Sequence, residues 1–114
     1  KAPASTAGDL ILKGKGITAR GRETTEGFIV RVGSQAVKEE VPSIHGYLSE
    51  LRRALVNQGV LEDAGSIYRL TQDYTFDSPS TAAGVLLGRS ANGRQEWKDA
   101  KGRTLKEIQE ADLS

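Results

Sequence analysis

The stretch DSPSTAAGVLLGRSANGRQEWKD, residues 77–99, decides the fold because it joins a helix, a turn and the single tryptophan in one uninterrupted run. Ser78 is placed to cap a helix, with Pro79 at the first helical position, where the N–H that proline lacks has no intrahelical partner. Residues 81–87 are small or apolar, so this helix can lie close against a sheet. We expect it to end near Gly88, a residue type that favours helix ends.

The second half of the stretch predicts a tight turn followed by a strand. Asn92 and Gly93 form the dipeptide that is most typical of two-residue hairpin turns. Residues 95–98 then predict a short strand that carries Trp97. Residues 104–108 are expected to close the fold as a strand or a short helix.

Outward from this stretch, apolar and β-branched segments predict further strands. We expect strands at residues 10–12, 17–22 and 28–32, joined as an antiparallel meander because the links are too short for crossover helices. Residues 66–71 alternate apolar and polar side chains and predict another strand. Residues 74–76 are expected to extend it after a bend.

Residues 43–58 predict the main helix. Ser43 follows Pro42 and is the expected N-cap, and Gly59 suits the C-terminal end. One apolar stripe recurs at helical spacing: Ile44, Tyr47, Leu48, Leu51 and Leu55. The predicted fold class is therefore α+β, an antiparallel β-sheet of about five or six short strands with two packed α-helices.

Length and composition agree with one folded domain. The chain has 114 residues, 37% hydrophobic and 27% charged, which indicates a globular protein. We assign residues 1–9 to a linker, residues 10–108 to a single accessory domain and residues 109–114 to an acidic tail. Methionine is absent, even at position 1. We therefore expect a domain excised from a longer protein whose N-terminal part can carry the activity.

The composition also restricts compartment and chemistry. No cysteine is present, which excludes disulfides and thiolate metal sites and fits a cytoplasmic protein. No apolar run approaches the roughly 18 residues of a membrane span. No secretion signal opens the chain. We therefore expect no membrane partner.

The net charge of +1 hides an uneven distribution. Residues 1–34 hold six basic and three acidic residues, and residues 87–106 hold six basic and two acidic residues. Residues 35–86, by contrast, hold four basic and seven acidic residues. If the two basic segments lie side by side, they form a positive patch. The alternative is ordinary solvated charge.

Catalytic and metal-binding patterns are poorly represented. His45 is the single histidine, so it lacks the partner that a general base or a zinc site needs. The adjacent acidic pairs at residues 39–40 and 62–63 match no metal-binding motif and are expected to be solubilising charge. The glycines beside Lys15 and Arg89 form no phosphate-binding loop, which requires a Gly-Lys-Ser/Thr ending. We expect no catalysis, no cofactor and no metal.

The residues best suited to a partner follow the helix of the opening stretch. Arginine and lysine supply phosphate contacts and asparagine pairs with a base edge, so we expect a nucleic-acid surface at Arg89, Asn92, Arg94, Lys98, Lys101 and Arg103. Basic residues of the N-terminal strands extend this surface: Lys13, Lys15, Arg20 and Arg22. Trp97 has two interpretations, stacking on a base or packing in the core, and the core is favoured.

The same segment carries a family resemblance, which covers about residues 10–108. Its motifs are FDSPSTAA at residues 76–83, LGRSANGR at residues 87–94, EWKD at residues 96–99 and GRTL at residues 102–105. With these motifs the chain resembles the bacterial domain of unknown function DUF4357.

The resemblance implies a role beside nucleic-acid enzymes. Domains of this family often lie C-terminal to a GIY-YIG nuclease domain, or in proteins linked to restriction and modification. They are distantly similar to the RAMA domain, which is thought to bind DNA. That domain tends to carry a second aromatic residue just after the Asn-Gly dipeptide, whereas this chain has Arg94, which argues against an aromatic cage for a methylated base. The chain lacks the GIY and YIG motifs, so we do not expect it to be the nuclease.

Two functions are expected on these grounds. The first is a non-catalytic accessory module that binds duplex DNA or positions the target of a nuclease or restriction-modification protein. The alternative is a protein-interaction module that docks a covalently linked nuclease domain or another partner protein. An exposed apolar patch away from the basic segments would favour the alternative.

Overall fold

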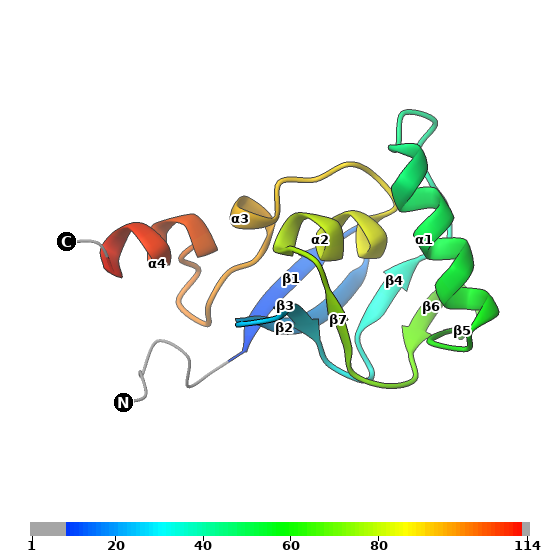
Figure 1. Ribbon diagram of the computed structural model, residues 1–114, viewed down its shortest axis with the longest axis horizontal. Coiled ribbons are helices and arrows are strands. Elements are labelled where there is room, and N and C mark those ends of the chain that lie inside the picture. The colour runs from blue at the N-terminus through cyan, green and yellow to red at the C-terminus, as the bar shows by residue number, and fades with distance from the viewer. Residues whose placement is uncertain (1–8, 113–114) are drawn as a thin grey trace.

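The computed structural model describes residues 9–112 and has an α+β fold, as predicted. Two antiparallel sheets lie side by side (Figure 1). The first has the strand order β1-β2-β3-β7 and is built from Leu10–Gly14, Ile17–Thr24, Gly27–Val30 and Tyr74–Phe76. The second has the order β4-β6-β5 and is built from Gln35–Val37, Ile67–Leu70 and Leu61–Asp63.

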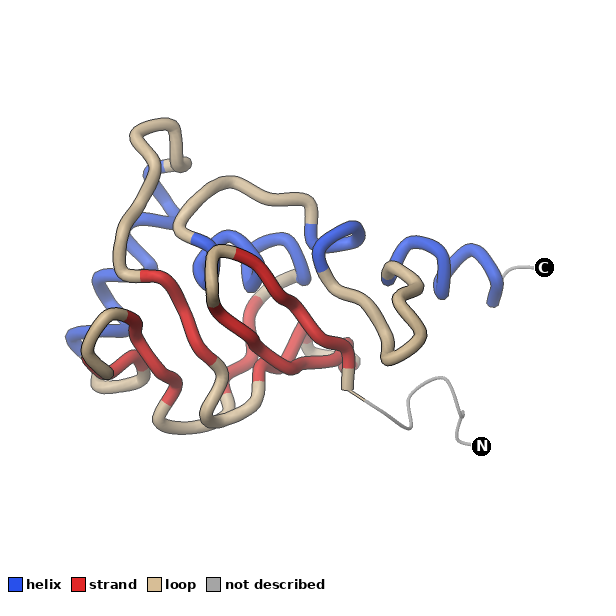
Figure 2. The backbone as a smooth tube through the Cα atoms, turned by 180° about the vertical axis from the view of Figure 1, so that it is seen from behind, coloured by secondary structure: helices blue, strands red, loops and turns tan. Residues whose placement is uncertain are grey.

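Four helices accompany the sheets in the described part of the chain: α1 (Gly46–Asn57), α2 (Pro79–Leu87), α3 (Gly93–Glu96) and α4 (Leu105–Asp112). Helices α1 and α2 lie in front of the strands in Figure 1. In Figure 2, which is seen from behind, the strands are nearest the viewer and these helices lie beyond them. The helices therefore cover one side of the sheets and leave the opposite side open.

The predicted meander of the first three strands is confirmed, but the single sheet is wrong. Residues 74–76 do not extend β6; they cross to the first sheet, where Phe76 pairs with Phe28 and Tyr74 pairs with Val30. Both members of the first pair are buried. Burial of two aromatic side chains on one sheet outweighs the local continuity of the sequence pattern.

The core lies between the first sheet and α2. Every residue from Thr81 to Leu87 is buried, so the small-residue helix is enclosed on all sides. Ser78 caps it by accepting a hydrogen bond from the Thr81 N–H at 3.1 Å, and Gly88 ends it in the left-handed conformation. The predicted boundaries of this helix are confirmed.

Helix α1 begins later than predicted. Its N-cap is His45, whose side chain makes no capping hydrogen bond, rather than Ser43. The Ile44 N–H donates to the Val41 carbonyl oxygen at 3.1 Å, which closes a turn around Pro42 and Ser43. Proline favours the second position of such a turn, so these two residues belong to the turn and not to the helix.

The tight turn predicted at Asn92 and Gly93 opens helix α3 and joins no two strands, because the Gln95 N–H donates to the Asn92 carbonyl oxygen at 3.0 Å. The strand predicted at residues 95–98 is wrong. Asn92 is instead the N-cap of α3, and its Oδ1 accepts a hydrogen bond from the Arg94 N–H at 3.1 Å. A Cβ on Gly93 would lie 2.2 Å from the Pro79 carbonyl carbon. Glycine is required here for close packing against the start of α2 and not for a hairpin.

The C-terminal segment forms helix α4, which settles the choice left open at residues 104–108. Thr104 and Glu107 form a capping box: the Glu107 N–H donates to Thr104 Oγ1 at 3.1 Å, and Glu107 Oε1 accepts from the Thr104 N–H at 2.8 Å. The Thr104 backbone N–H and hydroxyl both donate to the Glu107 carboxylate, and these two bonds lower the pKa of Glu107. The helix continues to Asp112, so the boundary predicted at residue 108 falls inside it.

The expected linker lies outside the described residues except for Asp9, which is ion-paired with Arg31 at 3.2 Å. Among residues 9–112, no helix combines the length and apolarity that a membrane crossing requires.

Candidate nucleic-acid interface

The motif at residues 77–99 holds helix α2, helix α3 and Trp97 together. Ser80 Oγ accepts a hydrogen bond from the Gly93 N–H at 2.9 Å, and Trp97 Nε1 donates to the Pro79 carbonyl oxygen at 3.1 Å. Together these bonds hold α3 and the tryptophan against the first turn of α2. The Ser-Pro-Ser and Asn-Gly parts of the motif are therefore held together, although Gly93 lies 13 positions after Ser80.

Trp97 is a core residue, as the sequence favoured. Its side chain is fully buried, and its ring centroid lies 4.6 Å from that of Phe28 on the first sheet. A buried indole has no free face to offer a base, so the stacking interpretation is wrong for this arrangement.

Several of the predicted contact residues have partners within the domain. Arg89 is ion-paired with Glu96 at 3.2 Å, and Arg103 is ion-paired with Asp99 at 2.8 Å. The Arg94 Nε donates to the side-chain oxygen of Gln109 at 2.8 Å. These contacts hold the guanidinium groups close to the domain, and the roles predicted for them in nucleic-acid binding stay predictions.

Lys98 occupies a different position, because its backbone pairs with strand β1. The Ile11 N–H donates to the Lys98 carbonyl oxygen at 2.6 Å, and the Lys98 N–H donates back to Ile11 at 2.9 Å. Lys98 also forms a bridge to Thr104 on its other side. The basic C-terminal segment therefore lies against the N-terminal strands. This is the condition under which the sequence predicts a positive patch.

We call the side of the first sheet opposite α2 the outer face; its basic members are Lys13, Arg20, Arg22 and Lys98. In β2, residues 17, 19 and 21 are buried, while Arg20 and Arg22 alternate with them and are exposed. Ile11 is directly opposite both Arg20 and Lys98, so their side chains share one face. Lys13 follows two residues after Ile11 and points to the same side.

These four cations are uncompensated. Among the described residues, none of their side-chain nitrogens has a hydrogen-bond or ion-pair partner, in contrast to Arg89 and Arg103. Their neighbour Arg31 is held between two carboxylates: Asp9, whose hydrogen bond raises the pKa of Arg31, and Asp73. The positive charge of Arg31 is neutralised by these carboxylates. The four other cations therefore determine the positive charge of the outer face.

A concavity of about 300 Å³ lies where the two basic segments meet. Lys13, Lys98 and Ile11 line it, together with residues of the turn at 99–102. Its two lining carboxylates, Glu96 and Asp99, are ion-paired with Arg89 and Arg103. Lys101 is exposed on that turn, so it extends the outer face along the edge of β1.

Two other residues singled out in the sequence lie away from the outer face or are engaged elsewhere. Lys15, in the turn after β1, donates from Nζ to the Leu87 carbonyl oxygen at 3.3 Å. His45 is exposed at the start of α1, where its ring stacks on Tyr47 with 6.0 Å between centroids.

The sequence missed Ile11 and Thr18 as members of the outer face, and Gln35 of β4 beside it, whose Oε1 accepts a hydrogen bond from the Thr18 N–H at 3.0 Å. The alternation of residues 17–22 carried a signal for Thr18, because it has the same parity as Arg20. No signal marked Gln35, since it begins a strand of three residues that no pattern announced.

Comparison with known proteins gives one match. The family model described as a domain of unknown function, DUF4357, matches residues 10–109. A search of curated proteins and a search of solved structures each found no match.

Proposed function

The chain belongs to the DUF4357 family, and because that membership assigns no activity, we propose from its geometry that this domain is a non-catalytic accessory module that binds the phosphate backbone of duplex DNA. The outer face supplies the contacts. The observation that carries the proposal is the pairing of Lys98 with Ile11, which joins two basic segments into one uncovered surface.

The outer face suits backbone binding for three reasons. It is open to a large partner, since α1 and α2 lie on the opposite side (Figure 2). Its four cations need no rearrangement, because no protein carboxylate in the described segment has to be displaced from them. Its other side chains at these positions are short or aliphatic, such as Ile11, Thr18 and Ile29, so they do not hold a duplex away from the lysines and arginines.

Residues at the edge add a second set of contacts in this proposal. Lys101 lies in the turn that helps to line the concavity, and Arg103 directly follows that turn and is exposed despite its ion pair with Asp99. Arg89 precedes α3, Asn92 caps it and Arg94 lies in it, so these residues reach DNA only if it bends around that edge. We therefore assign them a smaller share of the affinity.

Catalysis is assigned to another domain. The single histidine, His45, is exposed and is the N-cap of α1. The proposed partner enzyme is a covalently linked nuclease or a restriction-modification protein in the cytoplasm, for which this domain holds or positions the DNA.

The protein-interaction alternative has weaker support. The large exposed hydrophobic residues in the described range are Val32, Tyr47 and Val56. Tyr47 and Val56 are separated by about two and a half turns of α1, which places them on opposite sides of the helix. Val32 lies in the connection between the two sheets. These side chains form no continuous apolar patch of the kind that marks a docking surface.

A duplex titration tests the proposal. With four phosphate contacts, the logarithm of the affinity should fall with the logarithm of the salt concentration with a slope of about −3 to −4. The variant Lys13→Ala/Lys98→Ala should bind a labelled duplex at least about tenfold more weakly at low salt. The matched control Arg53→Ala/Lys106→Ala removes the same charge from exposed positions on α1 and α4 and should stay within about twofold. Equal losses in the two variants, or no saturable binding, would contradict the proposal.

A further inference from the structure

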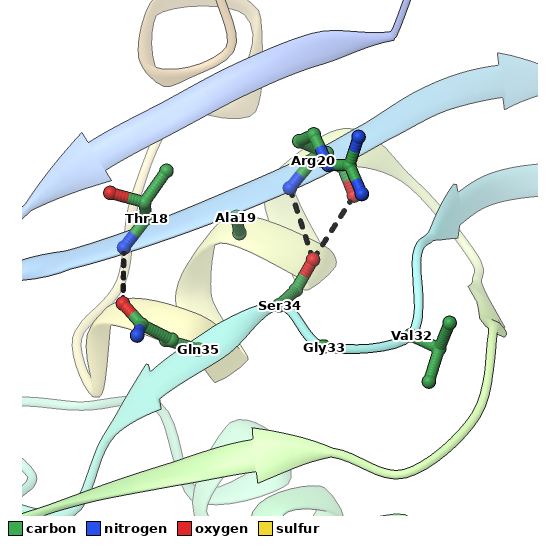
Figure 3. Close-up of a pocket in the computed structure, with 7 residues that line it drawn as sticks. All are labelled: Thr18, Ala19, Arg20, Val32, Gly33, Ser34 and Gln35. Carbon is green, nitrogen blue, oxygen red and sulfur yellow. Dashed lines mark hydrogen bonds between the residues drawn. The ribbon is translucent and has the colours of Figure 1, made fainter.

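The outer face contains a break beside strand β2, where the chain passes from β3 of the first sheet to β4 of the second. Strand β3 ends at Val30, the chain turns through Gly33 at a φ of 86°, and β4 begins at Gln35. Two side chains replace the missing backbone partners of β2 (Figure 3). Ser34 Oγ accepts from the Arg20 N–H at 3.0 Å, and Gln35 Oε1 accepts from the Thr18 N–H at 3.0 Å.

A concavity of about 320 Å³ lies at this break. Its lining contains no lysine and no carboxylate and consists of Thr18, Ala19, Arg20, Val32, Gly33, Ser34 and Gln35. Asp73 is the carboxylate near its Val32 end. It accepts a hydrogen bond from the Val32 N–H at 2.7 Å and one from Arg31 at 3.4 Å. The acidic group beside the concavity is therefore already satisfied, and the concavity keeps the positive charge of Arg20.

The hydrogen bonds at the break determine which groups stay free. Because Gln35 Oε1 is held by the Thr18 N–H, the other end of that amide, Nε2 with its two N–H donors, is the free end. The Arg20 guanidinium and the Thr18 hydroxyl have no protein partner within residues 9–112. Three different donors therefore line one small concavity, and one of them is charged.

We propose that this concavity is a phosphate-binding subsite, in which Arg20, Gln35 Nε2 and the Thr18 hydroxyl donate to the oxygens of a phosphate group. A guanidinium and neutral donors gathered in one place match an oxyanion better than a cation or an apolar ligand. The inference rests on the proposed function for its occupant, a backbone phosphate of bound DNA. Free inorganic phosphate has the same chemistry and is separated from DNA by the experiment.

The variant Gln35→Glu tests the subsite with little change in shape. It keeps an oxygen for the Thr18 N–H and replaces the free donor by a carboxylate oxygen, which repels phosphate. We expect duplex affinity to fall about tenfold, the size of one lost charge-assisted hydrogen bond. The control Gln58→Glu adds the same charge at the exposed end of α1 and should change affinity by less than about twofold. Equal effects of Gln35→Glu and Gln58→Glu overturn the subsite.

A second variant guards against a folding defect in the first. Thr18→Val keeps the branched shape and the backbone N–H and removes only the hydroxyl, so we expect a loss of about threefold in duplex affinity. Both variants should unfold at the same denaturant concentration as the unaltered domain. A normal duplex affinity in a folded Thr18→Val protein counts against the hydroxyl as a ligand and overturns the three-donor site.

Nitrogen-15 NMR of the side-chain amide of Gln35 separates this inference from the proposed function. The signals should move on titration with duplex, and with inorganic phosphate at higher concentration. If Lys13→Ala/Lys98→Ala weakens duplex binding but the Gln35 signals do not move, the proposed function is retained and the subsite is overturned. If the Gln35 signals move with inorganic phosphate but the domain binds no duplex, the anion subsite is retained. The proposed function is then overturned, and DNA is refuted as the occupant. No movement with either probe overturns the subsite.

Discussion

The hydroxyl and amide groups of the motif at residues 77–99 and the cations of the outer face, of which only Lys98 belongs to that motif, are used in opposite ways. In the motif, Ser78, Ser80 and Asn92 each accept a backbone N–H, and Trp97 donates to a carbonyl. On the outer face, the side chains of Lys13, Arg20, Arg22 and Lys98 have no partner in the part of the chain that the structure describes. The more recognisable region of the sequence is thus the structural one, and the less recognisable region is available for binding.

The comparison teaches that a specific sequence motif need not be a site. Small residues and hydroxyl groups at fixed spacing are what close packing requires, because each must fit one neighbour at one distance. Partner-free cations on a strand need only alternate with buried residues. The predictions below are ordered by expected effect and test this division between a buried framework and an available surface.

Replacing Trp97 by alanine should have the largest effect. It removes the largest fully buried side chain, its contact with Phe28 and its bond to Pro79. We expect the free energy of unfolding to fall by about 3–5 kcal/mol, measured by denaturant titration. In the Trp97→Phe variant the phenyl ring fills part of the cavity, so the free energy of unfolding should fall by less. A loss below about 1 kcal/mol for the alanine variant would show that Trp97 is not part of the framework.

Gly93→Ala should come next. The added methyl group would lie 2.2 Å from the Pro79 carbonyl carbon, and backbone cannot move aside as a flexible side chain does. We expect a loss of about 2–3 kcal/mol in the free energy of unfolding. Gly46→Ala is the matched control, because a Cβ there meets nothing within 4 Å. Equal stabilities of the two variants would refute the close approach of α3 to α2.

Ser78→Ala tests the capping of α2 at a smaller scale. It removes the acceptor of the Thr81 N–H at 3.1 Å and should cost about 1 kcal/mol of stability. Ser43→Ala serves as the control, since Ser43 lies in the turn before α1 and caps no helix. Its effect should stay within about 0.5 kcal/mol. The reverse order would contradict both the capping of α2 by Ser78 and the placement of Ser43 in a turn.

A weaker effect should appear as a pH dependence. Hydrogen bonds from Ser49 and then from the buried Arg52 lower the pKa of Glu40 below its ordinary value of 4.5. A lowered pKa in the folded state stabilises the fold fully above the unfolded value, and this stabilisation is lost as the pH falls through the folded value. Stability curves of the unaltered domain and Glu40→Gln should therefore converge below pH 4.5. Curves that stay parallel from neutral to acidic pH would contradict the interaction.

Removing the outer-face cations should have the smallest effect on stability. Lys13→Ala/Arg20→Ala/Arg22→Ala/Lys98→Ala deletes exposed side chains that touch no partner, so the free energy of unfolding should change by about 0.5 kcal/mol or less for each site. Denaturant titration measures the sum. A large loss would show that these side chains belong to the framework, and the division between the two regions would fail.

The sequence was sufficient where local rules decide the structure. The Ser-Pro start and glycine end of α2 and the first three strands follow from capping and alternation. The Thr104–Glu107 spacing is a capping-box signal that favours a helix over a strand, although the two alternatives were left open. By contrast, Pro42 and Ser43 satisfied a helix-start rule and a turn rule equally, and packing chose the turn.

For the candidate surface, local patterns placed Arg20 and Arg22 on one face of a strand, but they could not join Lys98 to Ile11. That pairing joins residues far apart in the chain, next to Trp97, which is buried against Phe28. Gln35 was invisible because its strand has three residues and its role depends on where β3 ends. Long-range contacts of this kind are set by tertiary packing and leave little trace in a local window.

The most direct test compares duplex affinity in two variants that each lose two positive charges. One, Lys13→Ala/Lys98→Ala, alters the outer face; the other, Arg94→Ala/Arg103→Ala, alters side chains that are bonded to Gln109 and Asp99 beside the motif. At one low salt concentration, we predict that the first variant binds at least about tenfold more weakly than the unaltered domain and that the second stays within about threefold. A greater loss in the second variant would contradict the assignment of DNA binding to the outer face.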